Sequence, residues 1–188
     1  VGQNLGAKTP ERAARVTWVA TAATMALLAS VAAVVFAFPA QAMRIFIDDP
    51  AVVAEGVLFL RIIAPFWAFF GGVMVIQGGF RGAGDTRVAM ALSILSRWVF
   101  RVPVAIALAF AWTLTIPGVD ITLNGFAIGV EGIWWAFSTG AFLSFLVAVA
   151  WFRLGNWQEG VIEESEEPGT GPGPAAADTD GDAEFVDD

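Results

Sequence analysis

The sequence contains no cysteine, no histidine and no tyrosine. Without thiols and imidazoles the chain cannot form disulfides, thiolate nucleophiles or Cys/His metal sites. Serine and threonine are present, but there is no histidine to activate their hydroxyl groups as nucleophiles. We therefore expect no catalytic residue, no metal site and no cofactor, and a protein that is not an enzyme.

Charged residues are also scarce: they make up 15% of the chain, against 57% hydrophobic residues, and the mean hydropathy is +0.69. Soluble domains rarely have this composition. The uncharged run from Ile62 to Phe80 is long enough to cross a hydrocarbon core of about 30 Å. Similar runs elsewhere predict an all-α integral membrane protein whose four transmembrane helices lie within residues 16–155, at about 16–43, 50–79, 86–116 and 130–153.

The glycine-rich stretch GGFRGAGDTR, residues 78–87, superficially resembles a phosphate-binding loop. It has neither the Gly-Lys-Ser/Thr ending of a Walker motif nor the spacing of a dinucleotide fingerprint, and it follows a predicted span rather than a strand. We interpret it as a tight turn between two helices, in which glycine ends the first near Gly78 or Gly79 and Asp85 or Thr86 caps the second. We expect no nucleic-acid partner.

Basic residues predict the orientation of the spans. Six of them fall on one side of the predicted membrane: Lys8, Arg12, Arg15, Arg81, Arg87 and Arg153. The other side has Arg44, and its second loop carries Asp120 and no cation. By the positive-inside rule, residues 1–15, both termini and the 78–87 turn are cytoplasmic, and the protein is a multi-pass protein of the cell membrane.

Residues 156–188 differ sharply from the rest of the chain. They contain eleven acidic residues and no lysine or arginine, so the net charge of −8 becomes +3 when they are left out. With GTGPGPAAA in the middle, this acidic segment is predicted to be a disordered tail. Its composition is typical of a salt-loving organism.

Arg97 and Arg101 are the charged residues expected inside a span. A charge in the membrane is costly, so it normally faces a cavity or a partner. The two residues are four positions apart on one helix face, with Pro103 just beyond them. Either they line a polar cavity between helices, or their long side chains reach back to the cytoplasmic headgroups.

Several segments together resemble the multidrug and toxic compound extrusion (MATE) family of efflux transporters. These segments are VGQNLGAKTPERAARV at the start, LRIIAPFWAFFGGVMVIQGGFRGAGDTRVAM, the Arg101-Val102-Pro103 run and GVEGIWWAFSTG. The resemblance covers about residues 1–157, and the RGAGDTR turn is its most specific element. It implies two six-helix bundles around a central cavity, from which drugs or organic cations leave in exchange for H⁺ or Na⁺.

The resemblance further implies that this chain corresponds to the last four of twelve helices, so its partners would be the lipid bilayer and the remaining helices of the full-length transporter. It assigns a structural and gating role to Arg81, Gly82, Gly84, Asp85, Thr86 and Arg87. No coupling residue is carried over. Two alternatives remain: an exporter of lipid-linked oligosaccharides with the same bundles, and a small four-helix scaffold that transports nothing.

Overall fold

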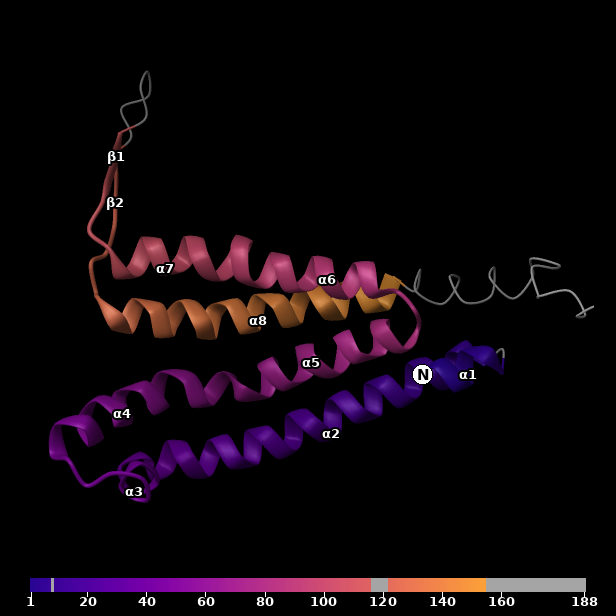
Figure 1. Ribbon diagram of the computed structural model, residues 1–188, viewed down its shortest axis with the longest axis horizontal. Coiled ribbons are helices and arrows are strands. Elements are labelled where there is room, and N and C mark those ends of the chain that lie inside the picture. The colour runs from indigo at the N-terminus through magenta and orange to yellow at the C-terminus, as the bar shows by residue number, and fades with distance from the viewer. Residues whose placement is uncertain (8, 116–121, 155–188) are drawn as a thin grey trace, which may run out of the picture.

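Four helical segments of the computed structural model, which describes residues 1–7, 9–115 and 122–154, are long and apolar enough to cross a membrane. They are Pro10–Ala37, Pro50–Gly82, Thr86–Ala109 and Val130–Leu154. The predicted fold class and number of spans are therefore confirmed. The second segment lies between the first and the fourth, and the fourth packs against the third (Figure 1). The predicted acidic tail lies outside the described residues.

The first span is helix α2 (Pro10–Ala37), preceded by the short α1 (Gly2–Gly6) and followed by α3 (Pro39–Arg44). We predicted an unbroken helix at 16–43, but α2 starts and stops about one and a half turns earlier. The early end is explained by Pro39, which has no N–H to donate and whose ring disfavours helical geometry at the residue before it. Phe38 accordingly has φ −126° and ψ 51°.

The second span consists of α4 (Pro50–Ile63), a 3₁₀ turn η1 (Ala64–Phe66) and α5 (Trp67–Gly82). The Asp49 carboxylate caps α4 by accepting hydrogen bonds from the N–H groups of Ala51 and Val52, at 2.8 and 3.3 Å. The helix tightens at Pro65, which cannot donate to the preceding turn. The Ser138 hydroxyl donates to the carbonyl of Ile62 in that turn, at 3.1 Å, so a neighbouring span satisfies a backbone group beside the break.

The third span is divided into α6 (Thr86–Ile94), a π-helical segment η2 (Leu95–Arg101) and α7 (Val102–Ala109). The π segment ends two residues before Pro103, whose missing N–H disturbs the helical hydrogen bonds. The span ends at Ala109 rather than at the predicted residue 116. Strands β1 (Thr113–Thr115) and β2 (Thr122–Asn124) follow and form an antiparallel pair that we did not predict.

The connection that leads from α7 to the last helix explains why α7 ends where it does. Phe126, Ile128 and Gly129 donate their backbone N–H groups to the carbonyls of Ala107, Leu108 and Ala109, at 2.9, 2.9 and 3.2 Å. The indole N–H of Trp112 reaches the carbonyl of Ile106 at 3.0 Å. The last four carbonyls of a helix have no partner within it, and here all four are satisfied by the connection to the last helix, α8 (Val130–Leu154).

Glycines allow α2 and α5 to approach closely. A Cβ at Gly71 would overlap a Leu28 methyl carbon, and one at Gly79 would lie 2.9 Å from the Thr17 methyl carbon. These two glycines are eight residues apart and form a small-residue stripe facing α2, as is common between membrane helices.

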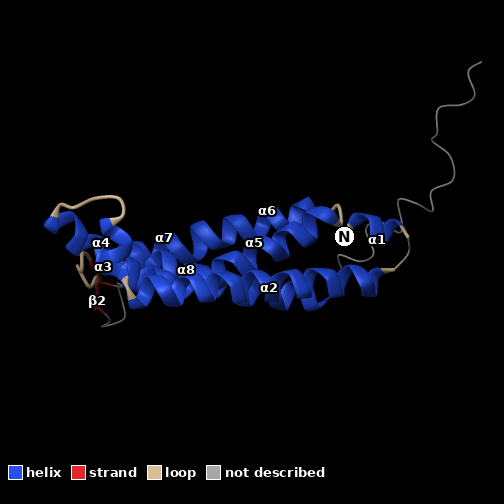
Figure 2. Ribbon diagram, turned by 90° about the horizontal axis from the view of Figure 1, so that it is seen from below, coloured by secondary structure: helices blue, strands red, loops and turns tan. Residues whose placement is uncertain are grey.

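The two ends of the molecule differ in their connections. The α5–α6 turn, α1 and the last turn of α8 lie at one end, whereas α3, the start of α4 and the strands lie at the other (Figures 1 and 2). The side chains of Ile76, Phe80, Leu92 and Phe152 are buried near the first end, where the Phe80 and Phe152 rings meet edge to face with centroids 5.5 Å apart. This packing holds α5, α6 and α8 together beside the turn.

Candidate functional site

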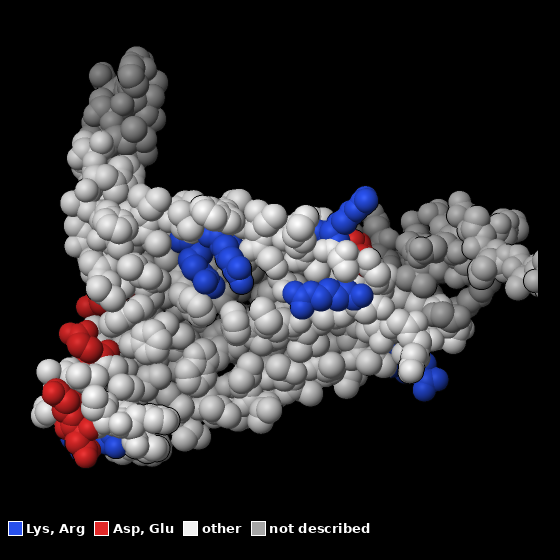
Figure 3. Space-filling view, viewed as in Figure 1, with Lys and Arg blue, Asp and Glu red and all other residues white. Residues whose placement is uncertain are grey.

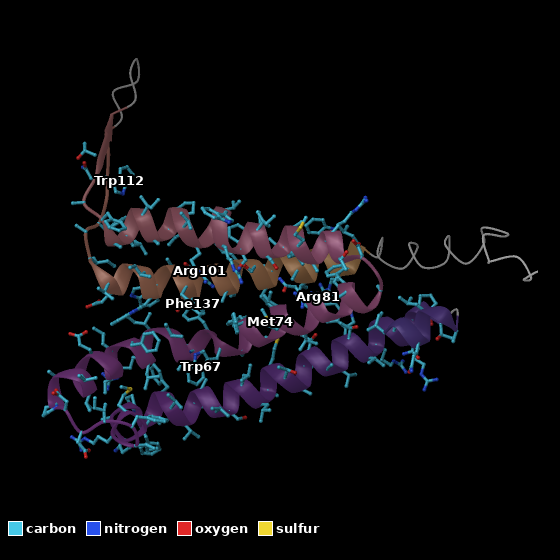
Figure 4. The ribbon with its side chains drawn as sticks, viewed as in Figure 1. Trp67, Met74, Arg81, Arg101, Trp112 and Phe137 are labelled. Atoms are coloured by element: carbon cyan, nitrogen blue, oxygen red, sulfur yellow. The ribbon has the colours of Figure 1, made fainter. Side chains whose placement is uncertain are left out.

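A cavity of about 190 Å³ lies between α5, the third span and α8. We call it the arginine cavity, because Arg97 and Arg101 contribute its only charged groups among the residues the structure describes. Figure 4 shows Arg101 close to Phe137, with Met74 across from them on α5. The lining residues are Phe70, Val73, Met74, Gln77, Ser93, Ser96, Arg97, Arg101, Phe137, Ala141 and Ser144.

Arg101 is held against α8. Its guanidinium carbon lies 4.2 Å from the centroid of the Phe137 ring, a cation–π contact. The backbone of α8 at Gly140 also lies beside Arg101, since a Cβ there would be in van der Waals contact with the Cβ of Arg101, at 3.4 Å. The Nε atom of Arg101 is buried and has no hydrogen-bond partner within the described ranges. The side chain is thus packed in place while part of its polar edge is unused.

Arg97 lies on the wall of the same cavity and is exposed. No Asp or Glu is among the lining residues, and the sequence has no acidic residue between Glu55 and Asp85 or between Asp85 and Asp120. Figure 3 shows a basic cluster in the middle of this face, while acidic side chains gather near α3 and α4. The cavity is therefore positively charged, with no carboxylate on its described walls to offset the charge.

A buried amide connects the cavity to the α5–α6 turn. Gln77 is 3% exposed; its side-chain N–H donates to the hydroxyl of Ser93, and its carbonyl oxygen accepts from Arg81, both at 3.4 Å. The Ser93 hydroxyl donates in turn to the carbonyl of Ala89 at 3.0 Å. Sequence reasoning missed Gln77, although it is the one amide side chain in the run from Ile62 to Gly79.

The turn between α5 and α6 is built from the RGAGDTR residues. Helix α5 ends at Gly82, later than the predicted Gly78 or Gly79, and Gly84 has the left-handed φ of 80° that glycine adopts without strain. The N–H groups of Gly84 and Asp85 donate to the carbonyls of Arg81 and Phe80, at 3.1 and 3.0 Å, which is a Schellman motif.

The same turn starts α6. The Asp85 carboxylate caps the helix by accepting from the N–H of Val88 at 3.2 Å, so Asp85 rather than Thr86 serves as the cap. Thr86 is the first helical residue, and its side chain and those of Arg81 and Arg87 are exposed. The six turn residues are thus close together in space, but only Arg81 is linked to the cavity, through Gln77.

A second, apolar cavity of about 390 Å³ adjoins the first between α4, α5 and α8. We call it the aromatic groove, since its lining consists of Phe59, Ile63, Trp67, Phe70, Ile133, Trp134 and Phe137. Phe70 and Phe137 also line the arginine cavity, so the two spaces share a wall. The combination places an aromatic surface next to two guanidinium groups.

Comparison with known proteins identifies the family of this chain. The family model MatE matches residues 1–107, more than half of the chain. The chain belongs to the MatE family. It is 33% identical over 159 residues to a probable multidrug resistance protein NorM of Mesorhizobium japonicum, covering 81% of this chain and 31% of the relative. With a probable NorM of Thermotoga maritima it shares 25% over 133 residues, 71% of this chain and 26% of the relative.

The solved structure of the MATE transporter ClbM in complex with Rb⁺ has the same fold. Its TM-score is 0.66 at 22% identity, covering 84% of this chain and 34% of that one. The MatE chain described here thus spans about a quarter to a third of the length of these proteins. The relatives are named as multidrug resistance proteins and a transporter, which agrees with the expectation that the chain is not an enzyme.

Proposed function

We propose that this chain forms part of a secondary active exporter of drugs or organic cations, driven by H⁺ or Na⁺. Its membership of the MatE family and the multidrug resistance names of its relatives support this proposal. None of the relatives described above is named for lipid-linked sugars, so drug export is the better supported of the two transport functions. The observation that carries the proposal is a charged cavity between three apolar spans, since charges within spans mark substrate or ion pathways.

The positive charge also limits what this part of the exporter does. A drug cation and two guanidinium groups repel each other, and the described spans offer no carboxylate along the cavity. We infer that the cationic group of a drug and the coupling ion bind to residues elsewhere in the full-length protein. The described spans would supply aromatic surface and a positively charged wall.

The export activity can be tested with the full-length protein in a strain that lacks its own exporters. We expect efflux of a cationic dye above the empty-vector rate, and we expect it to stop when the driving gradient is collapsed. A protonophore and a sodium ionophore, used separately, identify the coupling ion. If the protein is present in the membrane and no drug or dye leaves faster than with the empty vector, the proposed activity is wrong.

We also propose that the α5–α6 turn and both termini are cytoplasmic, as the excess of basic residues at that end indicates. The chain has no native cysteine, so single cysteines report the orientation directly. Both Asp48 and Thr86 are exposed, at opposite ends of the spans. In whole cells, an impermeant maleimide should label the Asp48→Cys variant and should label Thr86→Cys only after permeabilisation. The opposite pattern would reverse the assigned orientation.

A further inference from the structure

We propose that the short helix α1 is a strap that holds the α5–α6 turn closed throughout export, so that the turn is a fixed point of the protein and not a gate. This inference rests on the proposed export function, since it states which part of the protein stays still while that function is carried out. The MATE resemblance implied a structural and gating role for the turn, and only the structural role is kept. Three observations carry the inference: a close backbone contact, the burial of Leu5, and the attachment of α1 to α2.

The first observation is the contact between α1 and the end of α5, which lie at the same end of the molecule (Figures 1 and 2). A Cβ at Gly2 of α1 would lie 2.9 Å from the carbonyl oxygen of Gly82. A Cβ at Gly82 would lie 3.1 Å from the Cβ of Val1. Glycine allows such an approach because it has no Cβ of its own. The backbone of α1 is therefore packed directly against the last turn of α5.

The second observation is the burial of apolar side chains around this contact. Leu5 of α1 is 2% exposed and belongs to the core cluster that includes Phe80 of α5 and Phe152 of α8. Ala83, inside the turn, belongs to the same cluster and is also 2% exposed. The cluster thus joins α1, the turn and two spans. Opening the turn would expose these side chains at the end of the spans, which the hydrophobic effect opposes.

The third observation is the attachment of α1 to the first span. The carbonyl of Asn4 accepts two hydrogen bonds from Thr9, one from its N–H at 2.9 Å and one from its hydroxyl at 2.8 Å. Thr9 is the residue from which α2 begins. Helix α2 in turn packs closely on α5 at Gly71 and Gly79. The strap is therefore held by the same span that packs along α5, and α1, α2 and α5 form one unit beside the turn.

A closed turn also fixes one wall of the arginine cavity. Arg81 lies at the strapped end of α5 and donates to Gln77, which lines the cavity. A path from the turn into the cavity would require α5 and α6 to separate, and this would break the hydrogen bond from Gln77 to Ser93. The movement that exposes the cavity during export should therefore occur away from the turn.

The first test joins the strap and the turn covalently in the full-length protein. The Val1 Cβ and a Cβ at Gly82 would be 3.1 Å apart, and disulfides need about 3.5–4.5 Å, so a small shift suffices. The Val1→Cys/Gly82→Cys variant, in a background without other cysteines, is oxidised or treated with a short bridging reagent. We expect nearly complete cross-linking and dye export within about twofold of the reduced form, because a cross-link slows export only if it blocks a movement. The two single-cysteine variants are the controls.

The second test follows the turn without a cross-link. Ala83 is buried, whereas Thr86, three residues later, is exposed, so Thr86→Cys is the matched control for Ala83→Cys. Both variants are labelled with a permeant maleimide in proteoliposomes, with and without the driving gradient and the exported dye. We expect Ala83→Cys to react at least about tenfold more slowly than Thr86→Cys in both conditions, since a buried thiol reacts only through local opening.

Faster labelling of Ala83→Cys during export, or a cross-link that stops export until it is reduced, would overturn the inference and make the turn a gate. If neither oxidation nor the bridging reagent joins the two cysteines, α1 is not docked on the turn and the inference is equally wrong. If the unaltered protein exports no dye, the proposed export function fails. In that case the cross-linking yield and the protection of Ala83→Cys under the applied gradient decide whether α1 holds the turn.

Discussion

Replacing Gly132 with alanine is expected to remove most of the correctly folded protein from the membrane. A Cβ at this position would lie 2.6 Å from the backbone nitrogen of Ala109 and 2.7 Å from the carbonyl carbon of Leu108. Real Cβ atoms do not approach backbone atoms this closely, and backbone cannot turn aside as a side chain can. The start of α8 would have to move away from the end of α7.

That movement would also break the cap of α7. The carbonyls of Leu108 and Ala109 accept hydrogen bonds from the residues just before α8, Ile128 and Gly129. Overpacking alone typically costs about 1–3 kcal/mol, and each hydrogen bond lost from the cap adds about 1 kcal/mol. We therefore expect a loss of at least about 3 kcal/mol, the upper end of the range for overpacking.

The measurement is the amount of monodisperse full-length protein that survives detergent extraction and heating. Gly78→Ala provides the control, since a Cβ at Gly78 has no atom within 4 Å and alanine is also the better helix former. It should match or exceed the unaltered protein in the same assay. A Gly132→Ala protein as stable as Gly78→Ala would mean that α7 and α8 are not in this close contact.

The second large effect concerns the chain expressed alone. Residues 1–188 without any further segment should export no cationic dye above the empty-vector level, while the full-length protein does. The chain corresponds to only 26–31% of the length of two NorM relatives. A transport pathway in this architecture is formed between helix bundles, and four spans cannot enclose one.

The exposed surface of the spans supports this expectation. In the described part of the chain, Val19, Leu27 and Val34 on α2 are more than 60% exposed, which lipid tolerates, but the exposed Arg97 would also meet lipid. The isolated chain should therefore aggregate or oligomerise. Efflux by the isolated chain that depends on an ion gradient would contradict this prediction and indicate that several copies assemble into a complete transporter.

The fold was largely predictable because the membrane imposes simple rules. Uncharged runs such as Ile62–Phe80 indicate spans by length alone, and Asp49 before Pro50 indicates a helix start. Helix ends near the surface were less predictable, because they depend on partners distant in sequence. The end of α7 is an example: Ala109 is the last helical residue because Gly129, beyond the strands, supplies its hydrogen bond.

The candidate site was predictable only in part. The charge of Arg97 and Arg101 identified them as unusual in a span, but sequence alone left a cavity and the headgroup region as alternatives. The structure places both residues on the wall of one cavity and packs Arg101 against Phe137 of α8, a contact that no local pattern predicts. Gln77 was missed for the same reason, since its significance depends on contacts with Ser93 and Arg81.

The π-helical segment η2 carries a consequence for the arginine pair. A π-helix bonds each residue to the one five positions away, so this stretch holds more chain per turn than an α-helix does. Removing one residue between Leu95 and Arg101 would let the span return to α-helical bonding with its two halves close to their present orientation, whereas removing one from the regular helix α6 would rotate them relative to each other by about 100°. The π-helical segment thus accommodates one residue without turning Arg101 away from α8, so a one-residue deletion inside it should be tolerated far better than a one-residue deletion inside α6.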